Sequence, residues 1–331
     1  MAKTVDEAFD IYQKNNVDIP YSNYIEAIES TNKVISAIQS FDNDGYFKLS
    51  KDYNERFGSF SRKTQIQPLN DIDLMFGLSG YQASYNEFDA IDNVRIYGNS
   101  DIPLHKDCMN EYGVLDSIKV LNKFKKRIEQ RYPGSNPPIR NEAAVILDFV
   151  STKWSFDIVP CFFTTVEKNG KNYFLIPNGK GNWQKTDPRL DRAWVDYVDK
   201  KENYQVRRLI RLCKKWFKIK KFKTPTSYLL ETLIVRYCSR KVTISKYIDL
   251  EFRYVLDYIK DAIYAPIMDL KNIQGNLNTL DFYNQHKISQ RADADCKIAY
   301  NAFCAEVHER NESKAINLWR DIFGEEFPTY G

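Results

Sequence analysis

Histidine is scarce in this chain, and its cysteines are not clustered. There are three histidines (His105, His286 and His308) and no Cys-x-x-Cys pair. The nearest approach to a zinc spacing is His105-x-x-Cys108, for which a packing role is favoured over a structural zinc. We expect reduced thiols at all six cysteines: Cys108, Cys161, Cys213, Cys238, Cys296 and Cys304.

Long apolar runs are absent too. The first residues, Met1–Glu7, lack the apolar core of a signal peptide, and no run of ~18 apolar residues follows. We therefore expect a cytoplasmic protein without a membrane span. The net charge is only +4, which neither demands nor excludes a polyanionic partner.

What is present is enough for two folded lobes. The chain has 331 residues, of which 43% are hydrophobic and 28% charged, as in ordinary globular proteins. Strand-length apolar runs occur at about 69–76, 143–150, 154–163 and 173–176, with Asn169-Gly170 as a hairpin turn between the last two. Beyond about residue 187 the pattern is almost entirely helical, which predicts a lobe boundary near residue 190. Asp187 and Pro188 are expected to be the cap and the first position of a helix. Further helices are expected at about 203–221, 226–240 after a break at Pro225, 246–264, 292–310 and 314–323.

Two acids stand in the first apolar run. On a strand, residues two apart point the same way, so Asp71 and Asp73 share one face while Ile72 and Leu74 are buried on the other. Two adjacent carboxylates repel each other, and a divalent cation such as Mg²⁺ removes that conflict. The alternative is a strand end ringed by solvated acids, and an Asp-x-Asp pair alone does not decide between the two.

A Gly-Ser pair precedes the acids by eleven residues. Gly58 would let a phosphate approach the backbone N–H groups, and Ser59 would add a hydroxyl donor. The order and spacing of the two features strengthen each of them, and together they predict a phosphate-and-metal site.

At this point the sequence resembles a known family. Gly58-Ser59-Phe60-Ser61-Arg62-Lys63-Thr64-Gln65-Ile66, followed by Asp71-Ile72-Asp73-Leu74, resembles the polymerase-beta-like nucleotidyltransferase signature. It is most similar to the bacterial relatives of cyclic GMP-AMP synthase and oligoadenylate synthase, which are cyclic-oligonucleotide synthases of antiphage signalling. The likeness extends over most of the chain, including Ala315–Gly324 near its end.

The resemblance implies an α+β fold in two parts. Residues 1–190 would form the catalytic core, a mixed sheet with helices, with a helix at about 21–40 bridging both lobes; its apolar stripe would be Ile25, Ile28, Ile35 and Ile38. Residues 191–331 would form a helical lobe that completes the nucleotide pocket. The active site would lie in the cleft between the two, and no zinc-bearing DNA-sensing insert is visible.

The resemblance also implies a third carboxylate. Asp157, in Phe156-Asp157-Ile158-Val159-Pro160, matches the family's third acidic motif and alternates with apolar neighbours. Asp148 is the rival on spacing alone, and Asp157 is favoured. Asp71, Asp73 and Asp157 would hold two Mg²⁺ ions, with Mn²⁺ as a substitute, while one ribonucleotide attacks another and pyrophosphate leaves.

Three residues of the helical lobe are assigned by resemblance alone. Lys214 would hold the donor triphosphate, Ser227 would contact its phosphate tail, and Tyr228 would stack on its base. Six lysines between Lys214 and Lys223, interleaved with aromatics, are also compatible with a nucleic-acid footprint. A solvated basic helix face with a buried aromatic stripe explains the same pattern and is favoured for every lysine except Lys214.

The function expected from these residues is template-independent synthesis of a cyclic di- or trinucleotide from ATP, GTP or other nucleoside triphosphates, in antiviral defence. A monomer that needs no nucleic acid and answers to a regulatory protein partner is expected. The enzymatic alternative is a nucleotidyltransferase that adds nucleotides to RNA or to a protein. The non-enzymatic alternative, a silent nucleotide- or RNA-binding module, is disfavoured because all three acids are present.

Overall fold

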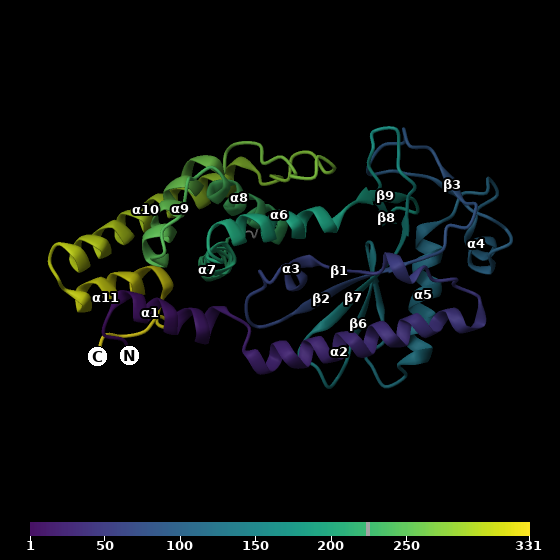
Figure 1. Cartoon of the computed structure of the whole chain (residues 1–331). Helices are drawn as coiled ribbons and strands as arrows, with labels where there is room; N and C mark the ends of the chain where they lie inside the picture. The colour runs from purple at the N-terminus through teal and green to yellow at the C-terminus, as the bar shows by residue number, and fades with distance from the viewer. Residues whose placement is uncertain (223–225) are drawn as a thin grey trace. The chain divides into compact units, whose positions relative to one another are not determined.

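The computed structural model of the protein describes residues 1–222 and 226–331, and it divides into two compact units. The sheet unit comprises Ser22–Ser61 and Leu69–Arg192, and the helical unit comprises Met1–Tyr21, Arg62–Pro68 and Ala193–Gly331. The chain therefore contributes both of its ends to the helical unit (Figure 1). The division into functional lobes at residue 190 stays a prediction, and these units differ from it at 1–21, 62–68 and 191–192.

The sheet unit is built on a seven-stranded mixed sheet. Its main path runs β1-β2-β7-β6-β5, and a hairpin of β8 and β9 extends from β7. The strands are β1 (Glu55–Phe57), β2 (Asp71–Gly77), β5 (Ile139–Asn141), β6 (Ala144–Asp148), β7 (Ser155–Phe163), β8 (Phe174–Pro177) and β9 (Trp183–Thr186). A separate two-stranded ribbon pairs β3 (Ser84–Tyr85) with β4 (Ile96–Tyr97). The four predicted strands and the hairpin across Gly170, which has a φ of 78°, are confirmed.

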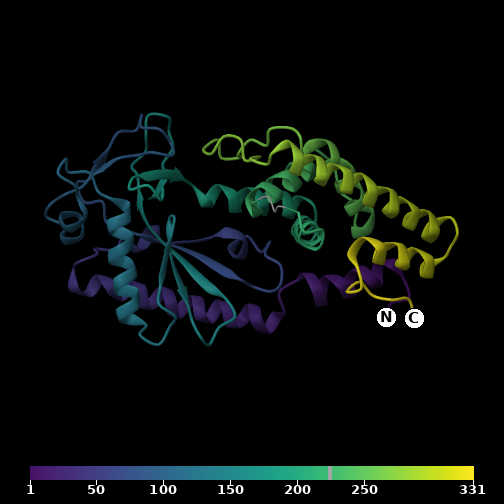
Figure 2. The ribbon, with the colours of Figure 1, turned by 180° about the vertical axis from the view of Figure 1, so that it is seen from behind.

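One face of this sheet carries α5 (Ser117–Arg131), which packs on β5, β6, β7 and β8 (Figure 2). The helix starts at Ser117 because the Asp116 side chain accepts the N–H groups of Ile118 and Lys119, at 2.8 and 3.2 Å. Phe124 of this helix meets Phe47 edge-on at 4.7 Å. Two short helices, α3 (Gly58–Ser61) and α4 (Pro103–Cys108), complete the unit together with α2 (Tyr21–Gln39).

The apolar stripe predicted for α2 is wrong. Its buried positions are Ala27, Thr31, Val34, Ala37 and Ile38, whereas Ile25 is 38% exposed. Of the four predicted isoleucines only Ile38 is buried. The buried positions recur every three or four residues and form one face, which Ile25, Ile28 and Ile35 flank.

The helical unit follows the predicted segments closely. It contains α1 (Val5–Tyr12), a π turn at Gln13–Val17, α7 (Val206–Ile219), α8 (Ser227–Ser239), α9 (Ile248–Ala262), α10 (Phe282–Val307) and α11 (Glu312–Phe323). The α6 helix (Pro188–Lys201) begins with the predicted proline, directly after Asp187, whose side chain accepts the Arg189 N–H at 3.1 Å. The α10 helix starts ten residues earlier than predicted, capped by Asp281. The predicted break at Pro225 lies outside the described residues.

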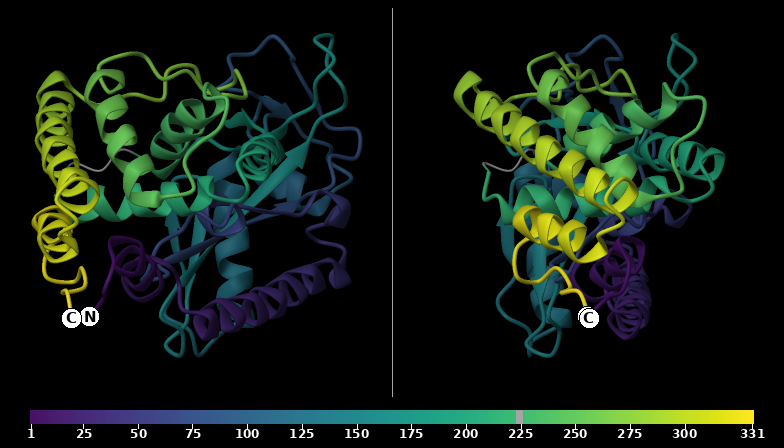
Figure 3. Two further views of the ribbon diagram at one scale, coloured as in Figure 1. Left: turned by 60° about the vertical axis from the view of Figure 1, so that its left-hand side comes forward. Right: turned by 90° about the vertical axis from the view of Figure 1, so that its left-hand side faces the viewer.

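Aromatic packing joins the two ends of the chain within this unit. Phe9 of α1 contacts Trp319 of α11, with ring centroids 4.8 Å apart, and Phe327 at 5.0 Å. The Ala2 N–H donates to the Thr329 carbonyl at 2.8 Å, so the termini lie side by side (Figure 3). The burial of these rings explains why the first residues fold with the last ones.

None of the six cysteines forms a disulfide, and four of them are buried. His105 is also buried, its Nδ1 accepts the Asn99 N–H at 3.2 Å, and burial lowers its pKa to about 4. No helix within the described residues has both the length and the apolar character that a membrane span requires.

Candidate active site

Strand register brings the three predicted acids together. The β2 and β7 strands are parallel, and Asp73 lies directly opposite Asp157 while Asp71 lies opposite Ser155. Asp71, Asp73 and Asp157 each offer a carboxylate oxygen, and these oxygens all lie within 4.8 Å of one another. Among the described residues, this is the one group of three potential ligands with such geometry.

The same face of the sheet becomes apolar beyond the acids. Met75 lies opposite Val159, and both are buried in a small cluster with Cys161 and Phe174. The three acids are half-buried and lie next to this apolar cluster. This placement removes part of the water around the carboxylates and strengthens their interaction with any charge nearby.

The electrostatics of Asp157 reflect that placement. Burial, followed by the charge of Asp71, raises the pKa of Asp157 to about 6. Both effects disfavour a third negative charge in the cluster. Three converging carboxylate oxygens are the donor set that a hard cation such as Mg²⁺ prefers, so these residues fit a divalent metal.

Asp148, the rival for the third position, lies elsewhere. It is the last residue of β6 and pairs in register with Ser155, whereas Asp157 pairs with Ile146. The Asp148 carboxylate accepts the Asn136 side-chain amide at 2.7 Å, and it is not part of the acidic cluster. The structure therefore groups Asp157, and not Asp148, with Asp71 and Asp73.

Gly58 lies against the acidic cluster. Its φ is 70°, in the left-handed region, and a Cβ atom at this position would fall 1.7 Å from Asp73 Oδ2. Phe57 pairs with Asp73 across β1 and β2, so the turn after β1 carries Gly58 and Ser59 past the carboxylate. Only glycine fits here, for reasons of both space and backbone conformation. Ser59 is half-buried, and the buried Phe60 next to it packs on Tyr24 at 5.5 Å.

Lys214 is held in a buried ion-pair network of the helical unit. Its Nζ lies 2.6 Å from Glu231, which also pairs with Arg62 at 2.6 Å. All three residues are less than a tenth exposed. Burial alone would raise the pKa of Glu231, but the charges of Arg62 and Lys214 lower it to about 2. Glu231 therefore stays ionised and fixes both cations.

Neither Arg62 nor Glu231 was assigned a role from the sequence, although Arg62 stands inside the Gly58–Ile66 motif. The available signal was Glu231 itself, an acid within the apolar run Leu229–Val235 of α8. A buried acid on an apolar helix face requires a cation, and Lys214 was the conspicuous cation of α7. Arg62 comes from a segment distant in the chain, so its participation depends on the tertiary fold.

Tyr228 is partly buried and already engaged. Its hydroxyl donates to Asp269, and Lys271 Nζ lies 4.5 Å from the ring centroid. Arg62 also lies near the ring, with its guanidinium carbon 5.8 Å from the centroid. Ser227 is exposed at the first position of α8, where Thr226 caps the helix. The nucleotide-binding roles of Lys214, Ser227 and Tyr228 stay predictions.

The basic run of α7 divides between core and surface. Trp216 and Phe217 are fully buried, as the favoured interpretation of a packing stripe predicts. Lys215 is buried, which contradicts the solvated face expected for it, and it pairs with Glu326 at 2.6 Å. Lys218 is exposed, as expected, and donates to the Gln67 carbonyl at 3.4 Å. Lys223 lies outside the described residues.

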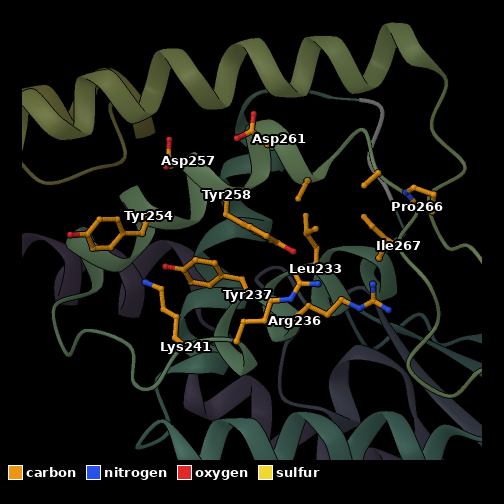
Figure 4. Close-up of a pocket in the computed structure, with 13 residues that line it drawn as sticks. Leu233, Arg236, Tyr237, Lys241, Tyr254, Asp257, Tyr258, Asp261, Pro266 and Ile267 are labelled. Carbon is orange, nitrogen blue, oxygen red and sulfur yellow. The ribbon is translucent and has the colours of Figure 1, made fainter.

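A cavity of about 620 Å³ lies between α8 and α9 (Figure 4). Its α8 side carries Arg236 and Arg240, and its α9 side carries Asp257 and Asp261, with three tyrosines between them. None of the predicted site residues lines it. Because its walls are oppositely charged, the cavity favours no single ligand chemistry.

Comparisons with known proteins find related sequences. A protein of Bacillus cereus (strain VD146), named "Probable cyclic nucleotide synthase", is 33% identical over 343 aligned residues, covering 100% of this chain and 99% of the relative. The cyclic AMP-AMP-AMP synthase of Acinetobacter sp. (strain ATCC 27244 / 9458) is 28% identical over 189 residues, covering 53% of this chain and 51% of the relative. No protein-family model matches the chain.

Solved structures show the same fold. Two structures of E. coli MS115-1 CdnC, one in complex with HORMA-deltaN and one with ATP, each superpose with a TM-score of 0.71 over 98% of both chains. Their sequence identity to this chain is 15%, so this likeness concerns the fold alone. It confirms the predicted mixed sheet with helices and a helical C-terminal region.

Proposed function

This chain belongs to the cyclic nucleotide synthases, which are nucleotidyltransferases, and we propose that Asp71, Asp73 and Asp157 are its catalytic and metal-binding residues. The observation that carries the proposal is the parallel register of β2 and β7, which gathers the three carboxylates on one face of the sheet. The substrates would be ribonucleoside triphosphates, and the product a cyclic di- or trinucleotide.

The cofactor would be two Mg²⁺ ions, or Mn²⁺ in their place. When bound, these ions lower the pKa of the attacking ribose hydroxyl and neutralise charge on the phosphates. Asp71 and Asp73 would hold both ions, and Asp157 would complete the ligands of the one nearest the attacking hydroxyl. The pKa of Asp157 is about 6, so its carboxyl group keeps a proton at lower pH. Asp157 would have to lose that proton before it could act as a metal ligand.

The other predicted residues would position the triphosphate. Gly58 allows the backbone to approach a phosphate closely, and Ser59 would donate its hydroxyl. Lys214 would supply a positive charge and Ser227 a hydroxyl, while Tyr228 would stack on a base. Each group acts by orientation and electrostatics, which are the main contributions a protein makes to phosphoryl transfer.

A cellular role in antiviral defence, a cytoplasmic location and a regulatory protein partner belong to the same proposal. The family resemblance supports the first, and nucleoside triphosphate substrates support the second. A partner is supported by the need to restrain a synthase of signalling molecules until it is required. We expect a monomer. We also expect that it needs no nucleic acid, because a net charge of +4 attracts long polyanions only weakly.

The deciding experiment is a product assay with a phosphatase challenge. The purified protein receives labelled ribonucleoside triphosphates with Mg²⁺ or Mn²⁺, with and without RNA, and the products are treated with phosphatase. A ring has no terminal phosphate, so phosphatase leaves its chromatographic mobility unchanged, whereas a linear oligomer loses its terminal phosphates and shifts, and tailed RNA stays far larger than either. A small product that phosphatase shifts completely, or strict dependence on added RNA, would contradict the cyclase, and labelled RNA would indicate an enzyme that adds nucleotides to RNA.

A further inference from the structure

A basic pocket of about 370 Å³ lies between the C-terminal end of α7 and the first turns of α10. Lys220, Lys221, Lys287 and Arg291 contribute positive charges to its lining, and Gln290 contributes an amide. No acidic residue is found in that lining, as far as the structure describes the chain. This pocket is built from the part of the basic run that the proposed catalytic roles do not use.

A buried carboxylate holds two of these cations in place. Asp295 is fully buried, 3.1 Å from Lys220 Nζ and 3.0 Å from Arg291 Nε. It also accepts the Trp216 indole N–H at 2.7 Å, which anchors it to the core. One carboxylate offsets one of four positive charges, so about three remain uncompensated around the pocket.

The other two cations project from the surface. Lys221 and Lys287 are exposed, and Lys287 Nζ lies 4.7 Å from the Tyr283 ring centroid. Lys221 and Gln290 form no side-chain hydrogen bond or ion pair with any described residue. Asn284 also lines the pocket, but its amide is engaged with Asp281 at 2.8 Å. Burial lowers the pKa of Lys220, although Asp295 acts to raise it, and the charge of Arg291 adds a smaller lowering. An anion nearby would favour the charged form of Lys220.

The pocket opens on a different side of α7 from Lys214. Lys214 and Lys220 are six residues apart, about 240° around a helix. Lys214 contacts Glu231 of α8, whereas Lys220 contacts Asp295 of α10. The cations that would serve the donor triphosphate and the cations of this pocket therefore belong to separate clusters.

We propose that this pocket is a second site, which binds the phosphate groups of a small phosphate-bearing molecule. Its volume is within the range of small-ligand sites, and clustered lysines with an arginine suit phosphate oxygens. A nucleic acid is disfavoured because Trp216 and Phe217 are fully buried, and Phe222 packs on them at 5.4 and 5.6 Å. Bases would find no exposed ring of α7 on which to stack, and the exposed Tyr283 ring beside the pocket has Lys287 over one face.

The test is isothermal titration of the full chain in EDTA, with pyrophosphate, ATP and single-stranded RNAs of several lengths as separate probes. EDTA keeps divalent metals away from the acidic cluster, so any phosphate binding must be metal-independent. The wild-type protein should bind pyrophosphate and ATP. The double variant Lys221→Ala/Lys287→Ala should bind both at least ~10-fold more weakly, because it lacks two charge-assisted contacts. If ATP binds more tightly than pyrophosphate, the ligand of the pocket is a nucleotide. If the two bind equally tightly, the ligand is a phosphate compound without a base.

Lys297→Ala is the matched control. Lys297 is an exposed lysine of the same helix, paired with Asp293 at 2.6 Å and outside the pocket. It should leave pyrophosphate binding unchanged, and all variants should melt as the wild type does. The proposal fails if the wild type binds neither probe, if the control and the double variant lose binding equally, or if RNA binds more tightly than ATP with an affinity that grows with length. None of these outcomes depends on whether the chain makes a cyclic product.

Discussion

Gly58 lies so close to Asp73 that the smallest side chain at this position would meet the carboxylate. A Cβ atom would be 1.7 Å from Asp73 Oδ2 and 2.5 Å from its Cγ. The start of α3, directly after β1, and the acidic face of β2 thus fit together only because residue 58 has no side chain. This contact explains physically why a glycine, and no other small residue, stands in front of Ser59.

Gly58→Ala should therefore reduce synthesis at least ~100-fold, because Asp73 must move from its position, and displacements of about 1 Å have effects of this size. The left-handed backbone adds a loss of stability of ~1–2 kcal/mol. Steady-state rates and thermal unfolding measure the two effects. Gly80→Ala is the control, since no atom lies within 4 Å of its Cβ position. Full activity of the Gly58 variant would show that Asp73 is not held where the chemistry occurs.

Asp71→Ala and Asp73→Ala should each abolish synthesis and leave the fold intact. Removing one member of a repelling group of carboxylates should keep the melting temperature of the metal-free protein unchanged or raise it. Product formation and thermal unfolding in EDTA are the measurements. Variants that are unfolded or poorly expressed would indicate a structural role and weaken the assignment of metal ligands.

Asp157→Asn should lower the rate at least ~100-fold, as expected when a metal site loses a charged ligand, whereas Asp148→Asn should have a mild effect. The two residues lie on neighbouring strands, so the pair is a matched comparison. The order of the two effects is the result that matters. A more sensitive Asp148 would contradict the assignment of Asp157 as the third ligand.

Tyr228→Ala should weaken nucleotide binding by ~1–3 kcal/mol, the value of one lost stack, while Tyr228→Phe should bind nearly as well as the wild type. The Phe variant loses the hydrogen bond to Asp269, but that carboxylate keeps the backbone N–H groups of Lys271, Ile273 and Gln274. We expect a stability loss of ~1 kcal/mol in the Phe variant. Nucleotide titrations separate the two variants. A severe binding defect in the Phe variant would assign a positioning role to the hydroxyl.

Stability should fall as the pH rises through neutrality, partly because of Glu306. Burial and the charges of Asp249, Glu312 and Asp6 raise the pKa of Glu306 to about 7. A raised carboxyl pKa means that the folded state favours the protonated form, so this contribution is complete below an ordinary pKa of about 4.5 and is lost above about pH 7. Glu306→Gln should therefore melt at a higher temperature than the wild type at about pH 8, with a smaller difference at about pH 5.

Glu309→Gln provides the comparison for that series. Glu309 is exposed and pairs with Lys314 at 2.8 Å, so its replacement should give no advantage that grows with pH. Identical pH profiles for the wild type and Glu306→Gln would show that this carboxyl is ionised in the folded protein at neutral pH.

The sequence determined what depends on neighbours along the chain. Alternation in Asp71–Leu74 placed both acids on one face, because successive side chains of a strand point in opposite directions. Caps and apolar periodicity located most helices after residue 187 for the same local reason. Where local information was incomplete, as in α2, the buried face is rotated away from Ile25, Ile28 and Ile35, and the isoleucine stripe was predicted wrongly.

Tertiary structure decided which of these segments meet. Both Asp148 and Asp157 stand in strands, and only the parallel pairing of β2 with β7 brings one of them beside Asp73. Likewise, Glu231 gathers Lys214 and Arg62 from separate segments. Such pairings follow from how whole apolar faces are buried together, a property of the entire core that no short stretch of sequence contains.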